Sequence, residues 1–87
     1  NAFWSLNFNL MRIEILTPDQ ELYSGEGSAV YAPGKDGSLG ILENHAALIT
    51  SLRNGKVEVE TPDGRKTFDV NGGVMEVLNN KVIILAQ

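Results

Sequence analysis

Apolar and polar residues alternate one by one along several short segments of this sequence, and this alternation predicts strands. In residues 11–15, methionine and two isoleucines alternate with arginine and glutamate, and residues 56–60 and 67–70 follow the same pattern. Successive side chains of a strand point to opposite faces of a sheet, so each segment has one apolar and one polar face. We therefore expect the apolar faces to be buried between packed layers of strands.

Turn-forming residues separate these segments at intervals of about 8–15 residues. Proline fixes φ, and glycine and asparagine accept positive φ, so all three are favoured where a chain reverses. The predicted turns are Thr17-Pro18-Asp19, Pro33-Gly34, Asn54-Gly55, Pro62-Asp63-Gly64, Asn71-Gly72-Gly73 and Asn79-Asn80. This rhythm predicts an all-β domain over residues 11–87, a small β-sandwich or flattened barrel of mostly antiparallel strands.

Some segments allow more specific predictions. Asn79-Asn80 lies between two apolar runs and predicts a two-residue hairpin, because asparagine tolerates positive φ. Residues 82–85 are apolar on both faces, so we expect a central strand there. Asn44 could cap a short helix, but we predict that residues 44–52 are extended or irregular. Gly72-Gly73 predicts a positive-φ turn, a bulge or the close approach of another backbone.

Composition limits the classes of function. The chain has 87 residues, which is one domain, and it contains no cysteine for a disulfide or a thiolate metal site. A formal net charge of −4 without a basic cluster argues against binding to duplex nucleic acid, where affinity comes mainly from neutralising phosphates. No apolar run approaches the roughly 20 residues of a membrane-spanning helix, so we expect any membrane association to be indirect.

The residue types that carry chemistry are few, and we predict no catalytic, cofactor or metal site. His45 is the only histidine, so it has no second imidazole or cysteine for zinc, and we interpret it as a structural or interface residue. The glycine-bounded residues 34–37 lack the Gly-x-x-x-x-Gly-Lys-Ser/Thr pattern that holds phosphate. We expect them to form an exposed turn or a turn that contacts another protein.

Residues 1–10 differ from the rest of the chain. They begin without methionine, and we interpret them as an N-terminal extension or, in part, an expression scar. Trp4, Leu6, Phe8 and Leu10 alternate with polar residues, which predicts either an added edge strand or a self-association contact.

Three blocks in a fixed order carry a resemblance to a known family. They are Gly-Ser-Leu-Gly-Ile-Leu at 37–42, His-Ala-Ala-Leu-Ile-Thr at 45–50 and Gly-Gly-Val-Met-Glu-Val at 72–77. With the strand at 11–16 before Thr17-Pro18, they make residues 11–87 resemble the N-terminal β-sandwich domain of the epsilon subunit of F-type ATP synthases. The chain departs from the family pattern at Ser38, usually acidic, at Glu43-Asn44, usually Pro-Gly, and at Ala47, usually proline.

The resemblance implies a non-catalytic rotor subunit of the central stalk. In that family the domain binds the gamma subunit and the ring of c subunits, and it couples proton or sodium ion flow to rotary ATP synthesis. The implied location is peripheral, on the cytoplasmic face of the bacterial inner membrane. By matching motif positions, the turn facing the c-ring would be Lys35, Asp36, Gly37 and Ser38, and the gamma-facing residues would be Glu43, Asn44 and His45.

Two further points stay open at this level. Members of the family usually continue into a C-terminal helical hairpin, and this sequence ends where the hairpin would begin, so either a naturally short subunit or a truncated one would fit. Its inhibitory role is not carried over. The alternative function is a ligand-binding β-sandwich module, which would use exposed aromatic residues, with Trp4, Tyr23 and Tyr31 as candidates.

Overall fold

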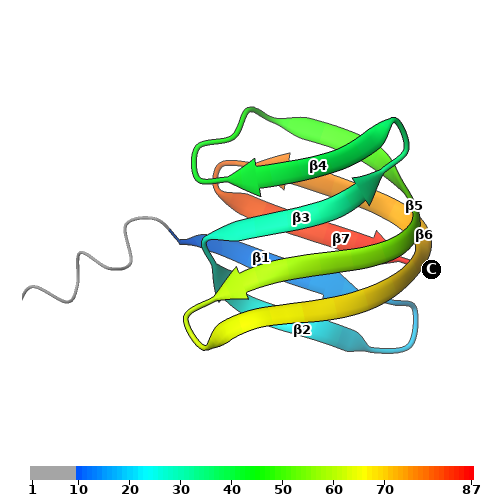
Figure 1. Ribbon diagram of the computed structural model, residues 1–87, viewed down its shortest axis with the longest axis horizontal. Coiled ribbons are helices and arrows are strands. Elements are labelled where there is room, and N and C mark those ends of the chain that lie inside the picture. The colour runs from blue at the N-terminus through cyan, green and yellow to red at the C-terminus, as the bar shows by residue number, and fades with distance from the viewer. Residues whose placement is uncertain (1–9) are drawn as a thin grey trace, which may run out of the picture.

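The structure, a computed structural model, describes residues 10–87, and this part of the chain consists of strands, turns and loops without a helix (Figure 1). The predictions for residues 1–9 lie outside the described residues. The strands are β1 (Met11–Leu16), β2 (Glu21–Gly27), β3 (Ala29–Gly34), β4 (Gly37–Leu42), β5 (Leu48–Thr61), β6 (Gly64–Leu78) and β7 (Lys81–Ala86).

One sheet in the order β2-β1-β7-β6-β5-β3-β4 folds over into two layers. The long hairpin of β5 and β6 belongs to both. Its half that includes Leu48 and Leu78 joins β7, β1 and β2 in what we call the β7 layer, and its other half joins β3 and β4 in the β3 layer. Within this sheet β1 and β7 are parallel and the remaining neighbours are antiparallel. The predicted sandwich of mostly antiparallel strands is confirmed.

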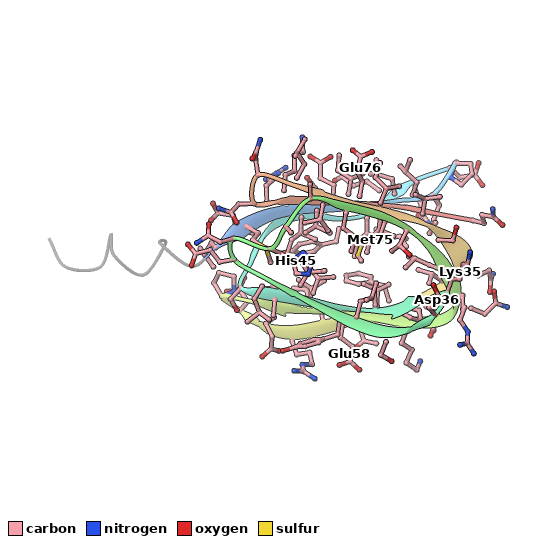
Figure 2. All side chains as sticks on the ribbon, turned by 90° about the horizontal axis from the view of Figure 1, so that it is seen from above. Lys35, Asp36, His45, Glu58, Met75 and Glu76 are labelled. Atoms are coloured by element: carbon pink, nitrogen blue, oxygen red, sulfur yellow. The ribbon has the colours of Figure 1, made fainter. Side chains whose placement is uncertain are left out.

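Aliphatic side chains fill the space between the layers. Met75, from the middle of β6, is fully buried there, whereas Glu76 and Glu58 lie on opposite outer faces (Figure 2). Each fully buried aliphatic side chain contributes about 1.5–3 kcal/mol relative to an exposed one. The alternation in the sequence therefore identified the inward-facing residues of β1 and β5 correctly. The buried cluster comprises Met11, Ile13, Ile15, Val30, Ala32, Ile41, Leu52, Val57, Val59, Val70, Met75, Val77, Val82, Ile84 and Ala86.

Several predicted turns are confirmed. Pro62 and Asp63 connect β5 to β6, and Asn79 and Asn80 connect β6 to β7 with φ values of 51° and 61°. Positive φ at both central residues is what a tight hairpin with the right-handed strand twist requires. β7 lies between β1 and β6, so the prediction of a central strand is also confirmed.

Two predicted turns are wrong, because Asn54-Gly55 and Asn71-Gly72-Gly73 lie inside β5 and β6. The pairing of the two strands keeps one register across both positions. Gly72 and Gly73 do have positive φ, 93° and 138°, but there the chain bends from one layer to the other and does not reverse. A Cβ on Gly73 would overlap the carbonyl oxygen of Leu85 and lie 2.9 Å from Ala86 Cα, so the predicted close approach of another backbone is confirmed.

A third turn is displaced along the chain. Pro33-Gly34 ends β3, and the reversal falls at Lys35-Asp36. Gly34 still requires the absence of a side chain, since its Cβ would lie 2.6 Å from the carbonyl oxygen of Gly37 and 2.8 Å from Leu39. The predicted extended or irregular segment is confirmed, with residues 45–47 irregular and β5 beginning at Leu48.

Candidate functional site

The turn between β3 and β4 projects from one end of the sandwich. Residues 35–38 are all exposed, and Figure 2 shows Lys35 and Asp36 at that end of the molecule. The backbone nitrogen of Lys35 donates a hydrogen bond to the carbonyl oxygen of Ser51 on β5, at 2.9 Å. Gly37 follows with a φ of 137°, and a Cβ placed there would meet no atom within 4 Å. The turn is thus exposed but attached to the long hairpin.

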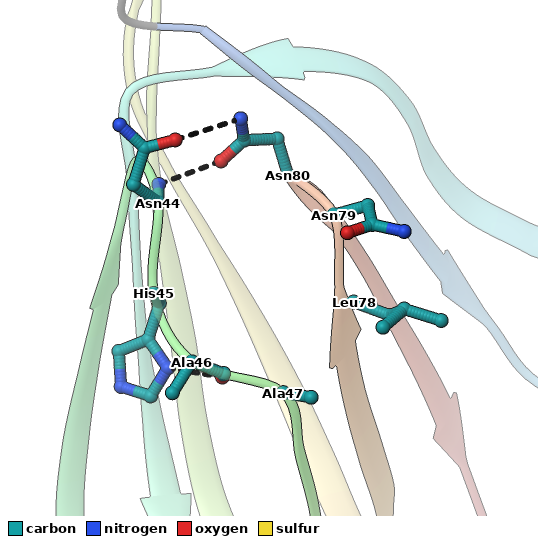
Figure 3. Close-up of a pocket in the computed structure, with 7 residues that line it drawn as sticks. All are labelled: Asn44, His45, Ala46, Ala47, Leu78, Asn79 and Asn80. Atoms are coloured by element: carbon teal, nitrogen blue, oxygen red, sulfur yellow. Dashed lines mark hydrogen bonds between the residues drawn. The ribbon is translucent and has the colours of Figure 1, made fainter.

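The loop between β4 and β5 is held by a pair of asparagines. The backbone nitrogen of Asn44 donates to Asn80 Oδ1 at 2.6 Å, and Asn80 Nδ2 donates to Asn44 Oδ1 at 3.2 Å (Figure 3). Both residues have positive φ, 64° and 61°, which asparagine tolerates better than most residues. These bonds fix the loop to the β6–β7 turn, 36 residues away in the sequence.

His45 follows directly and is exposed. Its backbone nitrogen donates to the carbonyl oxygen of Leu42 at 3.2 Å, and its Nδ1 lies 2.8 Å from the carbonyl oxygen of Ala46. A carbonyl oxygen only accepts, so this contact places a hydrogen on Nδ1 and leaves Nε2 open. In Figure 3 the imidazole lies on the side of the loop away from Leu78 and Asn79. Within residues 10–87 no group of three metal-ligating side chains comes together.

The two sets of predicted site residues are not brought together. Residues 35–38 lie at the start of β4, whereas residues 43–45 follow its end, with Glu43 half-buried and its two successors exposed. Four residues of extended strand, 39–42, separate the nearest members of the two sets by roughly 15 Å. The structure therefore has two separate candidate sites on one rigid domain.

The outer face of the β3 layer is charged, and its charges are paired within the domain. Lys56 Nζ donates to Asp69 Oδ1 at 2.7 Å, and Arg65 bonds to Glu58 at 2.8 Å and to Glu60 at 2.7 Å. The hydrogen bond to Asp69 raises the pKa of Lys56, and the bond to Glu60 raises the pKa of Arg65. These charged side chains of the β3 layer therefore form ion pairs with one another.

The tyrosines proposed for a ligand-binding module contact other residues of the domain. Arg65 lies over the ring of Tyr31, 5.4 Å from its centroid. Tyr23 is half-buried, with its ring centroid 5.9 Å from that of Phe68 and its hydroxyl donating to the carbonyl oxygen of Glu26 at 2.7 Å. Burial, followed by the charge of Asp63, raises the pKa of Tyr23.

The part of the β7 layer's outer face that is formed by β5, β6 and β7 is mainly apolar, and sequence reasoning missed it; the β1 part carries Arg12 and Glu14, which pair at 3.5 Å. It exposes Ile49, Val74, Leu78 and Leu85. The available signal was the double-sided apolar pattern of residues 82–85, which we attributed entirely to a central strand. The strand is central, but Leu85 is 55% exposed, so its outer face is not part of the core.

Two exposed loops held by hydrogen bonds and one exposed apolar sheet face define a β-sandwich domain with surfaces of the kind that proteins use for interaction. Among the described residues there is no helix long and apolar enough to cross a membrane. The family model for the ATP synthase delta/epsilon chain β-sandwich domain matches residues 10–87. The chain belongs to this family, and the epsilon chain is a non-catalytic subunit of the ATP synthase complex.

Individual relatives agree with the family match. The chain is 42% identical over 77 residues to the ATP synthase epsilon chain of Caulobacter vibrioides, covering 88% of this chain and 90% of that protein. It is 48% identical to the epsilon chain of Pelotomaculum thermopropionicum, covering 86% of this chain and 56% of the relative. The chain therefore spans nearly all of one bacterial relative and little more than half of another.

Solved structures share the fold. A chain in the mitochondrial ATP synthase of Euglena gracilis, in an assembly of OSCP, F1 and c-ring, superposes with a TM-score of 0.81 at 22% identity, covering 87% of this chain and 49% of that one. A chain in the central stalk and c-ring of the Tetrahymena thermophila mitochondrial enzyme gives a TM-score of 0.73 at 25% identity, covering 88% and 63%.

Proposed function

We propose that this chain is a rotor subunit of the central stalk, which binds gamma and the c-ring and couples proton translocation to rotary ATP synthesis. It makes and breaks no covalent bond in this role. The observation that carries the proposal is the placement of two exposed, hydrogen-bonded sites at opposite ends of β4 on one rigid domain of the epsilon family. The subunit is peripheral on the cytoplasmic face of the bacterial inner membrane and reaches the membrane only through the complex.

The turn of residues 35–38 is the proposed contact with the c-ring. It presents Lys35 and Asp36 side by side in solvent, and the bond from Lys35 to Ser51 connects it to β5. A turn that transmits load needs exposed polar groups for its partner and a firm attachment to its own domain. The β3–β4 turn has both.

Charge reversal tests this contact. Lys35→Glu with Asp36→Lys should change the free energy of unfolding by less than about 0.5 kcal/mol, as is usual for exposed positions. It should nevertheless lower ATP-driven proton pumping in vesicles that contain the reconstituted complex. Pumping equal to that of the parent would show that residues 35–38 do not contact the c-ring, and it would not bear on the proposed contact with gamma.

The loop of residues 43–45 is the proposed contact with gamma. The hydrogen bonds between Asn44 and Asn80 fix the backbone of the loop, so the side chain of the exposed His45 projects from a fixed position. His45→Trp adds bulk without removing either asparagine bond, so it should weaken gamma binding by steric conflict in a packed interface. Calorimetric titration with gamma measures this, and His45→Ala, which adds no bulk, is the control. Equal affinity of His45→Trp and the parent would place gamma elsewhere.

A further inference from the structure

The outer faces of the two layers differ in their exposed side chains, since one carries paired charges and the other exposes several large apolar residues. On the β3 layer Lys56 pairs with Asp69, and Arg65 pairs with Glu58 and Glu60, so these charges lie across the face. On the β7 layer the apolar side chains adjoin one another across β5, β6 and β7. Ile49 is 70% exposed, Leu78 is 54% exposed and Leu85 is 55% exposed. Contiguous exposed apolar area of this kind marks a protein interaction surface.

Glu76 lies at the centre of this face. The register places Ile49 of β5 and Ile83 of β7 directly beside it, and Val74 and Leu78 lie two residues away along β6 on the same face. Its exposed side chain projects outward in Figure 2. This part of the face therefore has one central carboxylate. Glu14 of β1 lies beyond Ile83 in the same row, but it pairs with Arg12 at 3.5 Å. We call Glu76 and its apolar neighbours the Glu76 face.

Glu76 makes no salt bridge with any of residues 10–87. The nearest cation on the face, Lys81, is one row away, paired with Leu78. Water can solvate the carboxylate in the free protein. A partner that covers the face removes that water, and an ionised carboxylate buried without a cation carries a large free-energy penalty. We therefore expect a tightly binding partner to supply a cation, because Lys81 lies one row away and Arg12, in that same row, already pairs with Glu14.

The need for a cation opposite Glu76 distinguishes a second copy of this chain from a different protein as the binding partner. A second copy of the chain docked face to face would bring a second Glu76 carboxylate into the same apolar surroundings, and the two charges would repel. A protein surface with apolar side chains around an arginine or lysine would satisfy both the patch and its charge, with arginine able to bond both carboxylate oxygens.

The Glu76 face is continuous with the loop assigned to gamma. One surface hollow is lined by residues 44–47 with Leu78 and the two turn asparagines, and a second is lined by Ala47, Ile49, Glu76 and Leu78. The hollows share Ala47 and Leu78. A partner seated on the loop therefore extends naturally over Ile49 to Glu76.

We propose that the Glu76 face is a binding surface for an apolar protein partner that carries an arginine or lysine, and that this cation pairs with Glu76. The identity of the partner as gamma rests on the proposed function, whereas its chemistry rests on the face itself. Glu76 then determines specificity, because an apolar surface without a cation would not be tolerated over it.

The test is calorimetric titration of gamma into three proteins: the parent, Glu76→Gln and the matched control Asp69→Asn. Both variants remove one carboxylate charge from an exposed strand position, but Asp69 lies on the opposite outer face. We expect Glu76→Gln to weaken gamma binding at least about tenfold, because the partner's cation is desolvated in the complex and loses its charged partner. Asp69→Asn should bind within about twofold of the parent. A fourth variant, Ile49→Ser, should also weaken binding.

The other possible results distinguish failure of the Glu76 inference from failure of the proposed function. Glu76→Gln binding gamma like the parent would overturn the inference and leave the rotor function standing. A parent that does not bind gamma would overturn the proposed function and the inference with it. A parent that dimerises in sedimentation, with Ile49→Ser monomeric, would assign the face to a second copy and overturn the inference alone. Unchanged circular dichroism of the variants excludes misfolding as the cause.

Discussion

Gly73 is the position where the fold most clearly requires glycine, because it combines a positive φ with no space for a Cβ, and Gly73→Ala tests this requirement. Gly73 has a φ of 138°, a backbone conformation that costs a residue with a side chain about 1–3 kcal/mol. Its new Cβ would also overlap the Leu85 carbonyl oxygen and approach Ala86 Cα to 2.9 Å. Backbone atoms of a central strand cannot rotate away, so relieving the overlap should cost about 1–3 kcal/mol more.

A matched glycine separates the two contributions. Gly64 also has a strained φ, 113°, but a Cβ placed there meets nothing within 4 Å. Gly64→Ala should therefore show the conformational cost alone, about 1–3 kcal/mol, and Gly73→Ala should show about 2–6 kcal/mol. A domain of this size is stable by roughly 4–13 kcal/mol, so Gly73→Ala removes a large part of that stability.

The assay is urea and thermal unfolding followed by circular dichroism. For a domain of 60–100 residues each kcal/mol corresponds to a change in Tm of about 4–8 °C, so a loss of about 3 kcal/mol lowers Tm by about 12–24 °C. If Gly73→Ala and Gly64→Ala lie within about 0.5 kcal/mol of each other, β7 can move aside. The interpretation of Gly73 as a close-approach position would then be wrong.

Three further expectations concern the core, a turn and the response to pH. Met75→Ala should cost about 2–5 kcal/mol, because its side chain is fully buried between the layers, whereas Leu85→Ala on the outer face should stay within about 0.5 kcal/mol; urea unfolding compares them. Asn80→Ala should cost about 1–3 kcal/mol, and Asn80→Gly should recover the part due to positive φ but not the lost hydrogen bonds, which unfolding of both variants resolves. Burial raises the pKa of Tyr23 in the folded state, so its contribution to stability is complete below about pH 10 and is lost as the pH rises through the folded value; Tyr23→Phe should flatten this alkaline loss in a pH series of unfolding curves.

Much of the fold follows from the sequence because its signals are local. The alternation in residues 11–15 decides which side chains face inward wherever the strand lies, since the side-chain period of a strand is fixed. Asn79-Asn80 forms its turn because positive φ is required within the turn itself. Neither prediction needed knowledge of a distant neighbour, and both were confirmed.

The errors have a common physical origin in distant neighbours. Asn71-Gly72-Gly73 does signal positive φ, but whether such residues reverse a strand or bend it depends on the partner strand opposite. β5 continues its pairing through this region, so β6 bends and does not turn. The bond between Asn44 and Asn80 likewise joins residues 36 apart, and no local pattern predicts it.

Of the candidate sites, one could be predicted from local sequence and another depends on how distant strands pack. The exposed turn at residues 35–38 was predictable from its turn-forming residues alone. The Glu76 face was not, because the apolar residues of β7 fit a buried position and an exposed interface equally well. Only the layers decide: one face of β7 packs on the core, and its other face, with Leu85, is uncovered by the described residues.

The attachments of the two loops bear on how a domain this small could transmit torque. The turn that we propose faces the ring bonds to Ser51 of β5, and the loop that we propose faces gamma leads directly into Leu48 of the same strand. Four residues of β5, paired throughout with β6, thus connect the two proposed contacts. Load passing between them would act along a continuous hydrogen-bonded hairpin that also frames the core, so slipping would require breaking several bonds together. The proposed role in coupling rotation requires this property, which follows from the length of β5 and β6 and from the bends at their glycines.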